Sequence, residues 1–238
     1  MKIIAIIQAR NGNSRLPNKG SMELLGKPML YHIIERVKRA TKLDQIVVAM
    51  PGAPEDQPLG WFCLEMRIPV FSGRLFGIND ADIVSRYLEA TGWFHADLIV
   101  RISADNPCIE PGEIDNLITE WADCTPDMLL PDNAENITED YDGFGGELYT
   151  YDMLKWMDKT IADPFYREHP HKFWYDIHRF VYCGKKYPPG FRLDVDTPAD
   201  YEKIKRIYDH FGHNHFHVSE VIEFLATNME ERPDSPRG

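Results

Sequence analysis

The 238-residue sequence has little of what marks an exported or membrane protein. The apolar run that opens the chain spans about six residues, far short of the roughly 20 that a membrane-spanning helix needs. Cysteine is also sparse: the four thiols are scattered and form no C-x-x-C pair, at Cys63, Cys108, Cys124 and Cys183. This scatter is typical of a reducing compartment rather than of a disulfide framework. We therefore expect a soluble, cytoplasmic protein.

An excess of positive charge is missing as well, because the formal net charge is −12. That balance argues against nucleic acid or an anionic membrane as a partner. The charge is uneven, however, since residues 1–42 hold nine Lys or Arg and only two acidic residues. Arg36, Lys38 and Arg39 fit a solvated helix face, but Arg10, Arg15 and Lys19 are left over and indicate a local anion site.

Strand and helix patterns alternate along the first 131 residues. Apolar runs rich in β-branched residues predict buried strands at 2–9, 45–50, 68–72, 97–102 and 127–131. Amphipathic stretches predict helices at 28–40, 57–67, 80–94 and 111–122. This alternation favours an α/β fold with a doubly wound, mostly parallel sheet.

The alternation breaks after residue 131. A polar, Gly-rich stretch is followed by a helix pattern at 151–161 and a segment rich in His and aromatics at 165–183. A strand, a turn and a helix are predicted over 191–211, with Thr197 or Asp196 as helix cap, and a last helix over 219–229. We expect one domain over 1–228, a cap or dimerisation insertion near 140–190, and a frayed tail at 229–238.

The loop QARNGNSRLPNKG, residues 8–20, follows the first predicted strand. Ligands of open α/β sheets bind beyond the carboxyl ends of the strands, where this loop lies. Gly12 lets the backbone approach a ligand closely, and Arg10, Arg15 and Lys19 can neutralise phosphates. The pattern is neither a P-loop nor a dinucleotide fingerprint. The competing interpretation is an ordinary loop with surface cations.

Two acidic motifs also follow predicted strands. RISADNP contains Asp105, and LDVDTP contains Asp194 and Asp196. Carboxylates beside phosphate-binding cations suggest Mg²⁺. The alternatives are that Asp105 belongs to a simple D-N-P turn and that Asp196 caps a helix, in which case Asp196 would not also bind metal.

These motifs together resemble a known family. QARNGNSRLPNK, GKPML, DIVSRY, RISADNPCIEP, REH and DVDTPAD are similar, in order, to motifs of bacterial cytidylyltransferases of the spore coat polysaccharide biosynthesis type. Those proteins are related to the octulosonate (KDO) and acylneuraminate cytidylyltransferases. The sequence departs from the family pattern at Asn13, Asn18 and Ala104, and it lacks the Q-P-T-S-P pattern of acylneuraminate enzymes.

The resemblance implies a Rossmann-like nucleotidyltransferase that forms a CMP-activated sugar acid or related surface-glycan precursor from CTP and releases pyrophosphate. It also implies a homodimer. Arg10, Arg15 and Lys19 would be catalytic and bind the phosphates, while Asp105 and Asp196 would hold Mg²⁺. The remaining implied site residues divide into nucleotide contacts at Ala9, Arg10, Gly12, Arg101 and Ala104, and acceptor contacts at Arg86, Glu147, Arg167 and His169.

Two other functions stay open at this stage. One is a nucleotidyltransferase that uses another nucleotide or a phosphorylated small-molecule acceptor, and the other is a non-catalytic nucleotide- or glycan-binding protein on the same fold. The histidine-rich stretch HFGHNHFH, residues 210–217, suggests zinc, but it lacks a Cys partner and straddles a predicted helix end. Histidines that interact with a helix C-terminus are the simpler interpretation.

Overall fold

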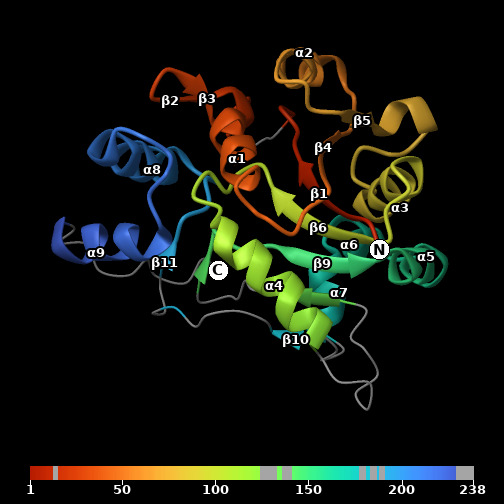
Figure 1. The fold of residues 1–238 in the computed structure, drawn as a ribbon. Helices are drawn as coiled ribbons and strands as arrows, with labels where there is room; N and C mark the ends of the chain where they lie inside the picture. The colour runs from red at the N-terminus through yellow and green to blue at the C-terminus, as the bar shows by residue number, and fades with distance from the viewer. Residues whose placement is uncertain are drawn as a thin grey trace.

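The computed structural model describes residues 1–12, 16–123, 133–135, 141–176, 181–182, 187 and 191–228. A seven-stranded sheet in the order β10-β7-β9-β6-β1-β4-β5 forms the centre of this part of the chain (Figure 1). Its strands are β1 (Ile3–Gln8), β4 (Gln45–Met50), β5 (Val70–Ser72), β6 (Leu98–Ser103), β7 (Asn133–Glu135), β9 (Glu147–Thr150) and β10 (Val181–Tyr182).

The sheet is parallel except for β9, which pairs antiparallel with β6 and β7. β1 lies between β4 and β6 and runs parallel to both, with Ile6 opposite Val47 on one side and Arg101 on the other. The carboxyl ends of these strands therefore lie at one edge of the sheet. Because β9 runs the other way, its first residue, Glu147, lies beside Arg101 near that same edge.

Helices cover the sheet on both faces (Figure 1). They are α1 (Met29–Val37), α2 (Gln57–Glu65), α3 (Ile83–Trp93), α4 (Pro111–Asp123), α5 (Tyr151–Thr160), α6 (Pro164–Glu168), α7 (Pro170–Asp176), α8 (Pro198–Phe211) and α9 (Val218–Asn228). Short 3-10 turns are η1 (Lys19–Ser21), η2 (Pro54–Asp56) and η3 (Gly73–Phe76). Two small ladders complete the fold, β2 (Glu23–Leu24) with β3 (Lys27–Pro28) and β8 (Tyr141–Asp142) with β11 (Phe191–Arg192).

Side chains of β1 alternate between two hydrophobic cores. Ile3, Ala5 and Ile7 pack into a core formed with α1, α2, α4, α8 and α9. Ile4 and Ile6 face the opposite core, which α3, α5 and α7 complete. A strand that is apolar on both faces belongs in a sheet covered on both sides, so the isoleucine-rich opening of the chain explains the layered architecture.

Arg36 of α1 is a charged side chain inside the larger core, with 0% exposure. Its guanidinium donates hydrogen bonds to the backbone carbonyls of Ile109 (2.6 Å), Asn214 (2.6 Å) and Phe216 (3.0 Å). The Glu110 carboxylate lies 3.9 Å away and balances the charge. Arg36 thereby fastens the segment between α8 and α9 to the first helix, which differs from the solvated position that its neighbours in sequence suggested.

The doubly wound, mostly parallel sheet predicted from the sequence is confirmed, and so are the strands predicted at 2–9, 45–50, 68–72 and 97–102. The strand predicted at 127–131 and the tail at 229–238 lie outside the described residues. Cys63 and Cys108 are buried, and burial raises the pKa of each thiol to about 12. Among the described helices, none has both the length and the apolar character required to span a bilayer.

Candidate active site

Asn11 fixes the loop that follows β1. Its backbone amide donates to Asp56 Oδ1 at 2.8 Å, and its side-chain amide donates to the Glu55 carbonyl at 2.9 Å. The buried Asp56 also accepts from the amides of Gly52 and Ala53, both at 3.1 Å. These contacts fasten the loop after β1 to the loop after β4, so the loops that follow these two strands are held together.

Asn18 closes the same loop onto itself. Its backbone amide donates to the Asn11 carbonyl at 3.1 Å, and it adopts a left-handed conformation with φ of 58°. Asparagine tolerates the left-handed region better than most residues, which explains how the turn forms with Asn18 at this position. The conformation leads the chain into η1, whose first residue is Lys19.

The ammonium group of Lys19 joins the two acidic motifs. Nζ lies 2.6 Å from Asp105 Oδ2 and 3.2 Å from Asp196 Oδ1, and it donates to the Val195 carbonyl at 3.1 Å. Only 9% of the Lys19 side chain is exposed. Burial alone would raise the pKa of Asp105, but the Lys19 charge and hydrogen bond outweigh it and lower that pKa. Asp105 and Asp196 therefore face one point, the Lys19 ammonium, and their predicted role as metal ligands stays a prediction.

The cap of α8 leaves Asp196 available to Lys19. The Thr197 hydroxyl accepts from the Asp200 amide at 3.3 Å, and Asp200 Oδ2 accepts from the Thr197 amide at 2.8 Å. Asp200 Oδ2 also accepts from the Asp196 amide at 3.2 Å, which orients the Asp196 backbone. Thr197 is therefore the N-cap, and the competing interpretation of Asp196 as the cap does not hold.

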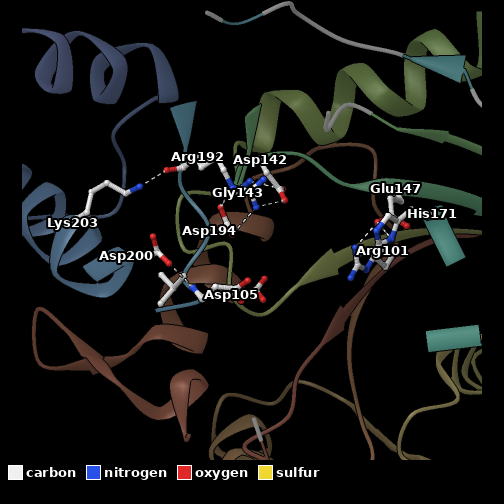
Figure 2. Close-up of polar contacts among 12 residues, drawn as sticks. Arg101, Asp105, Asp142, Gly143, Glu147, His171, Arg192, Asp194, Asp200 and Lys203 are labelled. Atoms are coloured by element: carbon white, nitrogen blue, oxygen red, sulfur yellow. Dashed lines mark hydrogen bonds and ion pairs between the residues drawn. The ribbon is translucent and has the colours of Figure 1, made fainter. Parts of the chain in front are cut away.

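A second acidic pair lies beside Asp105. Figure 2 shows Asp142 and Asp194 gathered around Arg192, whose guanidinium lies 2.9 Å from Asp194 and 3.4 Å from Asp142. Burial and the neighbouring Asp194 charge raise the pKa of Asp142 to about 7. Gly143 makes this arrangement possible: its φ is 94°, and a Cβ atom there would lie 2.2 Å from the Asp194 nitrogen.

A separate polar cluster surrounds Arg101 and Glu147 (Figure 2). The two side chains form an ion pair, and Tyr149 donates its hydroxyl to Glu147. Burial alone would raise the pKa of Glu147, but the Arg101 guanidinium outweighs it and lowers that pKa. His171 Nδ1 lies 3.7 Å from Glu147, and burial lowers its pKa to about 4, so the ring is neutral at pH 7. The Arg101 guanidinium is thus paired, and the predicted contact of this residue with a nucleotide stays a prediction.

Arg10 and Arg86 occupy different environments. Arg10 is partly exposed, 3.7 Å from the carboxylate of Glu168. Arg86 is 1% exposed and donates to the Asp80 carbonyl, and burial, together with the nearby Arg10 charge, lowers the pKa of Arg86. Arg10 is therefore placed at the surface of the site and Arg86 beneath it.

Arg167 and His169 lie on and after α6. The Arg167 guanidinium contacts Asp82 at 2.9 Å and Asp158 at 2.7 Å and donates to Ser85 and two backbone carbonyls. These contacts tie α6 to α3 and α5. The His169 ring lies 5.2 Å from the Phe165 ring, and burial lowers its pKa. Their predicted contacts with an acceptor stay predictions.

The remaining predicted nucleotide contacts are backbone groups. The amides of Ala9 and Ala104 donate at 3.0 Å to the carbonyls of Ala49 and Gln8. Gly12 is exposed at the end of the described loop. Arg15, together with Asn13, lies outside the described residues. The structure therefore brings Lys19, Asp105 and Asp196 into contact and leaves the other nucleotide contacts as predictions.

Sequence reasoning did not single out Asn11, Asp56, Asp142 or Arg192. Asn11 and Asp56 act through backbone amides on two different loops, a relationship that only the fold reveals. Arg192 and Asp142 meet because β8 pairs with β11 across fifty residues. The spacing of Arg192 and Asp194 was a usable signal, since residues two apart in an extended segment share a face.

The donor set at Lys19 suits Mg²⁺. Two carboxylate oxygens and the Val195 carbonyl already converge on one cation, the lysine ammonium. Within the described ranges, no group of three or more His, Cys, Asp or Glu side chains could hold a metal ion. A pair of carboxylates is what Mg²⁺ commonly takes from protein, because it keeps waters and binds substrate phosphates as its other ligands.

The histidines of 210–217 serve packing and hydrogen bonding. His210 stacks on Phe224 at 4.1 Å between ring centroids, and His217 Nδ1 lies 3.2 Å from Glu110. Gly212 ends α8 with φ of 68°. These contacts are packing and hydrogen bonding, and they differ from the interaction with a helix C-terminus expected from the sequence.

Comparison with known proteins assigns the family. A family model described as Cytidylyltransferase matches residues 4–222. The chain therefore belongs to the cytidylyltransferase family, as the sequence motifs predicted, and it is a nucleotidyltransferase.

The relatives extend over most of the chain. The spore coat polysaccharide biosynthesis protein SpsF of Bacillus subtilis is 27% identical over 241 residues, covering 96% of this chain and 95% of that protein. A 3-deoxy-manno-octulosonate cytidylyltransferase of Pelobacter propionicus is 29% identical over 178 residues, 66% of each chain. The structure of a cytidylyltransferase from Leptospira borgpetersenii superimposes with a TM-score of 0.86 at 24% identity, covering 96% and 95% of the two chains. The Rossmann-like fold prediction is confirmed by this likeness.

Proposed function

We propose that the protein transfers CMP from CTP to a sugar acid or a related precursor of a surface glycan, in a Mg²⁺-dependent reaction. The observation that carries the proposal is the meeting of Asp105, Asp196 and Lys19 beyond the carboxyl ends of β1 and β6. The acceptor class is supported by the relatives named for octulosonate activation and for spore coat polysaccharide biosynthesis.

The reaction joins an acceptor oxygen to the α-phosphorus of CTP. The new P–O bond forms as the bond to the bridging oxygen breaks, pyrophosphate leaves with the electron pair, and the proton of an acceptor hydroxyl passes to water. Negative charge grows on the leaving group, so cations placed there lower the barrier. Arg10 and Lys19 are the described cations of the loop that supply this charge, and Arg15 is the third predicted from sequence.

Asp105 and Asp196 would hold Mg²⁺, which neutralises phosphate charge and orients the reacting oxygens when it is bound. The protein's part is to keep Asp105 ionised and to aim both carboxylates at one point. The lowered pKa of Asp105 meets the first requirement. Two hydrogen bonds orient the carboxylates. The Asp196 amide donates to the Asp200 carboxylate, and the Val195 amide donates to the Asp105 carbonyl.

The acceptor side of the site is proposed to be the edge beside β9. Glu147 is buried and held in place by Arg101 and Tyr149, so its orientation is fixed before a substrate arrives. His171, neutral at pH 7, lies on the same carboxylate and can donate to or accept from a hydroxyl. A rigid polar wall of this kind suits the hydroxyl groups of a sugar.

The proposal is tested by release of pyrophosphate. The protein is incubated with CTP, Mg²⁺ and a panel of sugar acids, with neutral sugars and sugar phosphates as comparison acceptors. We expect release with CTP and a sugar acid, and its loss on chelation of the metal. Parallel reactions with UTP, ATP and GTP test the nucleotide. Pyrophosphate release that requires another nucleotide, or that proceeds only with a phosphorylated acceptor, contradicts the proposal. Tight binding of CTP without turnover of any acceptor also contradicts it and supports a binding protein instead.

A further inference from the structure

The position of Lys19 has a consequence for metal binding that rests on the proposed Mg²⁺ site. The two carboxylates proposed for the metal are held here by an ammonium group of the protein itself, at 2.6 and 3.2 Å. We propose that Lys19 and the divalent cation compete for Asp105 and Asp196, so that the metal binds together with the nucleotide and not before it.

The charges make simultaneous occupation unfavourable. Asp105 and Asp196 are 20% and 18% exposed, and the Lys19 side chain is 9% exposed, so water screens the group weakly. In such a setting a unit charge about 4 Å away interacts several times more strongly than it does in bulk water. A divalent ion bound to both carboxylates would lie within a few ångströms of Nζ if Lys19 stayed in place.

The Lys19 ammonium can leave the two carboxylates while the Lys19 backbone stays in place. Its backbone is fixed by η1 and by the contact of Asn18 with Asn11, while Nζ is carried on a flexible four-carbon stem. A triphosphate bound by the loop after β1 offers the ammonium new anionic partners. Once Nζ turns to these oxygens, both carboxylates are available to the metal.

Nucleotide and metal should therefore assist each other. The nucleotide removes the competing cation, and linkage requires that the metal raise the affinity for the nucleotide by the same factor. Before substrate arrives, Lys19 keeps the two carboxylates from repelling each other and preserves their separation. Lys19 is thus a positioning residue for the metal carboxylates in one state and a phosphate-binding residue in the other.

The test measures Mn²⁺ binding without nucleotide, by electron paramagnetic resonance of the free ion. We compare the wild type with Lys19→Met, which removes the charge and keeps most of the stem. Loss of the competing cation should tighten Mn²⁺ binding by about tenfold or more. The double variant Lys19→Met with Asp105→Asn should lose this gain, which locates the ion.

Lys203→Met is the matched control. Lys203 lies in α8 and donates to the Arg192 carbonyl at 2.8 Å, so its removal takes away a nearby lysine charge while the contacts of Lys19 remain. Its Mn²⁺ affinity should equal that of the wild type. Equal affinity in Lys19→Met and the wild type would overturn the competition, and so would a strong gain in Lys203→Met.

A second measurement covers the case in which Lys19→Met does not fold. Wild-type protein should show little rise in its unfolding temperature with Mg²⁺ alone, a rise with CTP in EDTA, and a larger rise with both than the sum of the two. A large rise with Mg²⁺ alone, abolished by Asp105→Asn, would contradict the proposal. Pyrophosphate release by the wild type tests the proposed function separately. If the wild type is active but Lys19→Met leaves the Mn²⁺ affinity unchanged, only the proposed competition is refuted.

Discussion

The backbone amide of Val195 donates a hydrogen bond of 2.9 Å to the carbonyl oxygen of Asp105. This contact joins the turn after β6 to the segment after β11, although the two are ninety residues apart in sequence. It places Asp105 and Asp196 on the same cation, and both carboxylates depend on it for their relative position.

Asp105→Asn should reduce pyrophosphate release by at least about 100-fold, because a neutral amide neither binds the metal well nor balances Lys19. Circular dichroism should stay close to that of the wild type, while the unfolding temperature should fall because the buried Lys19 loses a partner. Asp209→Asn is the control: Asp209 is exposed on α8 in a 2.6 Å pair with Lys205, so activity should be unchanged. Full activity of Asp105→Asn would remove this carboxylate from the site.

Thr197→Ala should lower the free energy of unfolding by about 1 kcal/mol, because it removes the side-chain cap of α8. Urea denaturation measures the change. The matched control is Thr227→Ala in α9, whose hydroxyl donates only to the Glu223 carbonyl of its own helix. That change should stay within about 0.5 kcal/mol of the wild type. If the two variants lose the same free energy, the capping assignment is wrong.

Asp142→Asn should change the pH dependence of stability. The pKa of Asp142 is raised to about 7, above the ordinary value of about 3.9 for an unfolded chain. The folded protein therefore holds this proton more tightly, and ionisation costs stability as pH rises from about 4 to 7. Asparagine avoids that cost.

Urea denaturation across pH tests this linkage. The variant should exceed the wild type by on the order of 1 kcal/mol near pH 8, and the difference should vanish near pH 4. Asp209→Asn, an exposed carboxylate, should follow the wild type at every pH. A variant that is less stable than the wild type near pH 8 would show that Asp142 is favoured as a carboxylate.

Arg36→Met should lower the free energy of unfolding by about 3–5 kcal/mol, because three buried carbonyls and Glu110 lose their partner. Lys38→Met, two residues further along the chain in an exposed pair with Glu35, should cost less than about 1 kcal/mol. Both values come from urea denaturation. A small loss in Arg36→Met would mean that the site repacks around methionine without strain.

The sheet was predictable because its signal is local. The isoleucine-rich strand at the N-terminus and the amphipathic helices after it carry their periodicity in a few adjacent residues. The loops that carry Lys19 and Asp105 follow β1 and β6, so the rule about strand ends brings them to one edge of the sheet. Asp196 follows β11, which belongs to a separate two-stranded ladder.

What was missed depends on pairs far apart in the chain. Nothing near Arg36 indicates that it lies in the core, because its partners are carbonyls 73, 178 and 180 residues later. The neighbours of Lys19 indicate a phosphate ligand, while its contacts in the folded chain are the two aspartates. Arg167 reads as a free cation in sequence, but Asp82 and Asp158 lie on helices that only the fold brings to it.

The partners of Arg36 also constrain how the chain matures during synthesis. The helix that carries it is synthesised well before the carbonyls of Asn214 and Phe216. Until these two residues emerge, the guanidinium has only the Ile109 carbonyl and the Glu110 carboxylate among its partners. Nascent chains that stop short of residue 217 should therefore stay sensitive to protease, because α1 is not yet joined to the segment between α8 and α9.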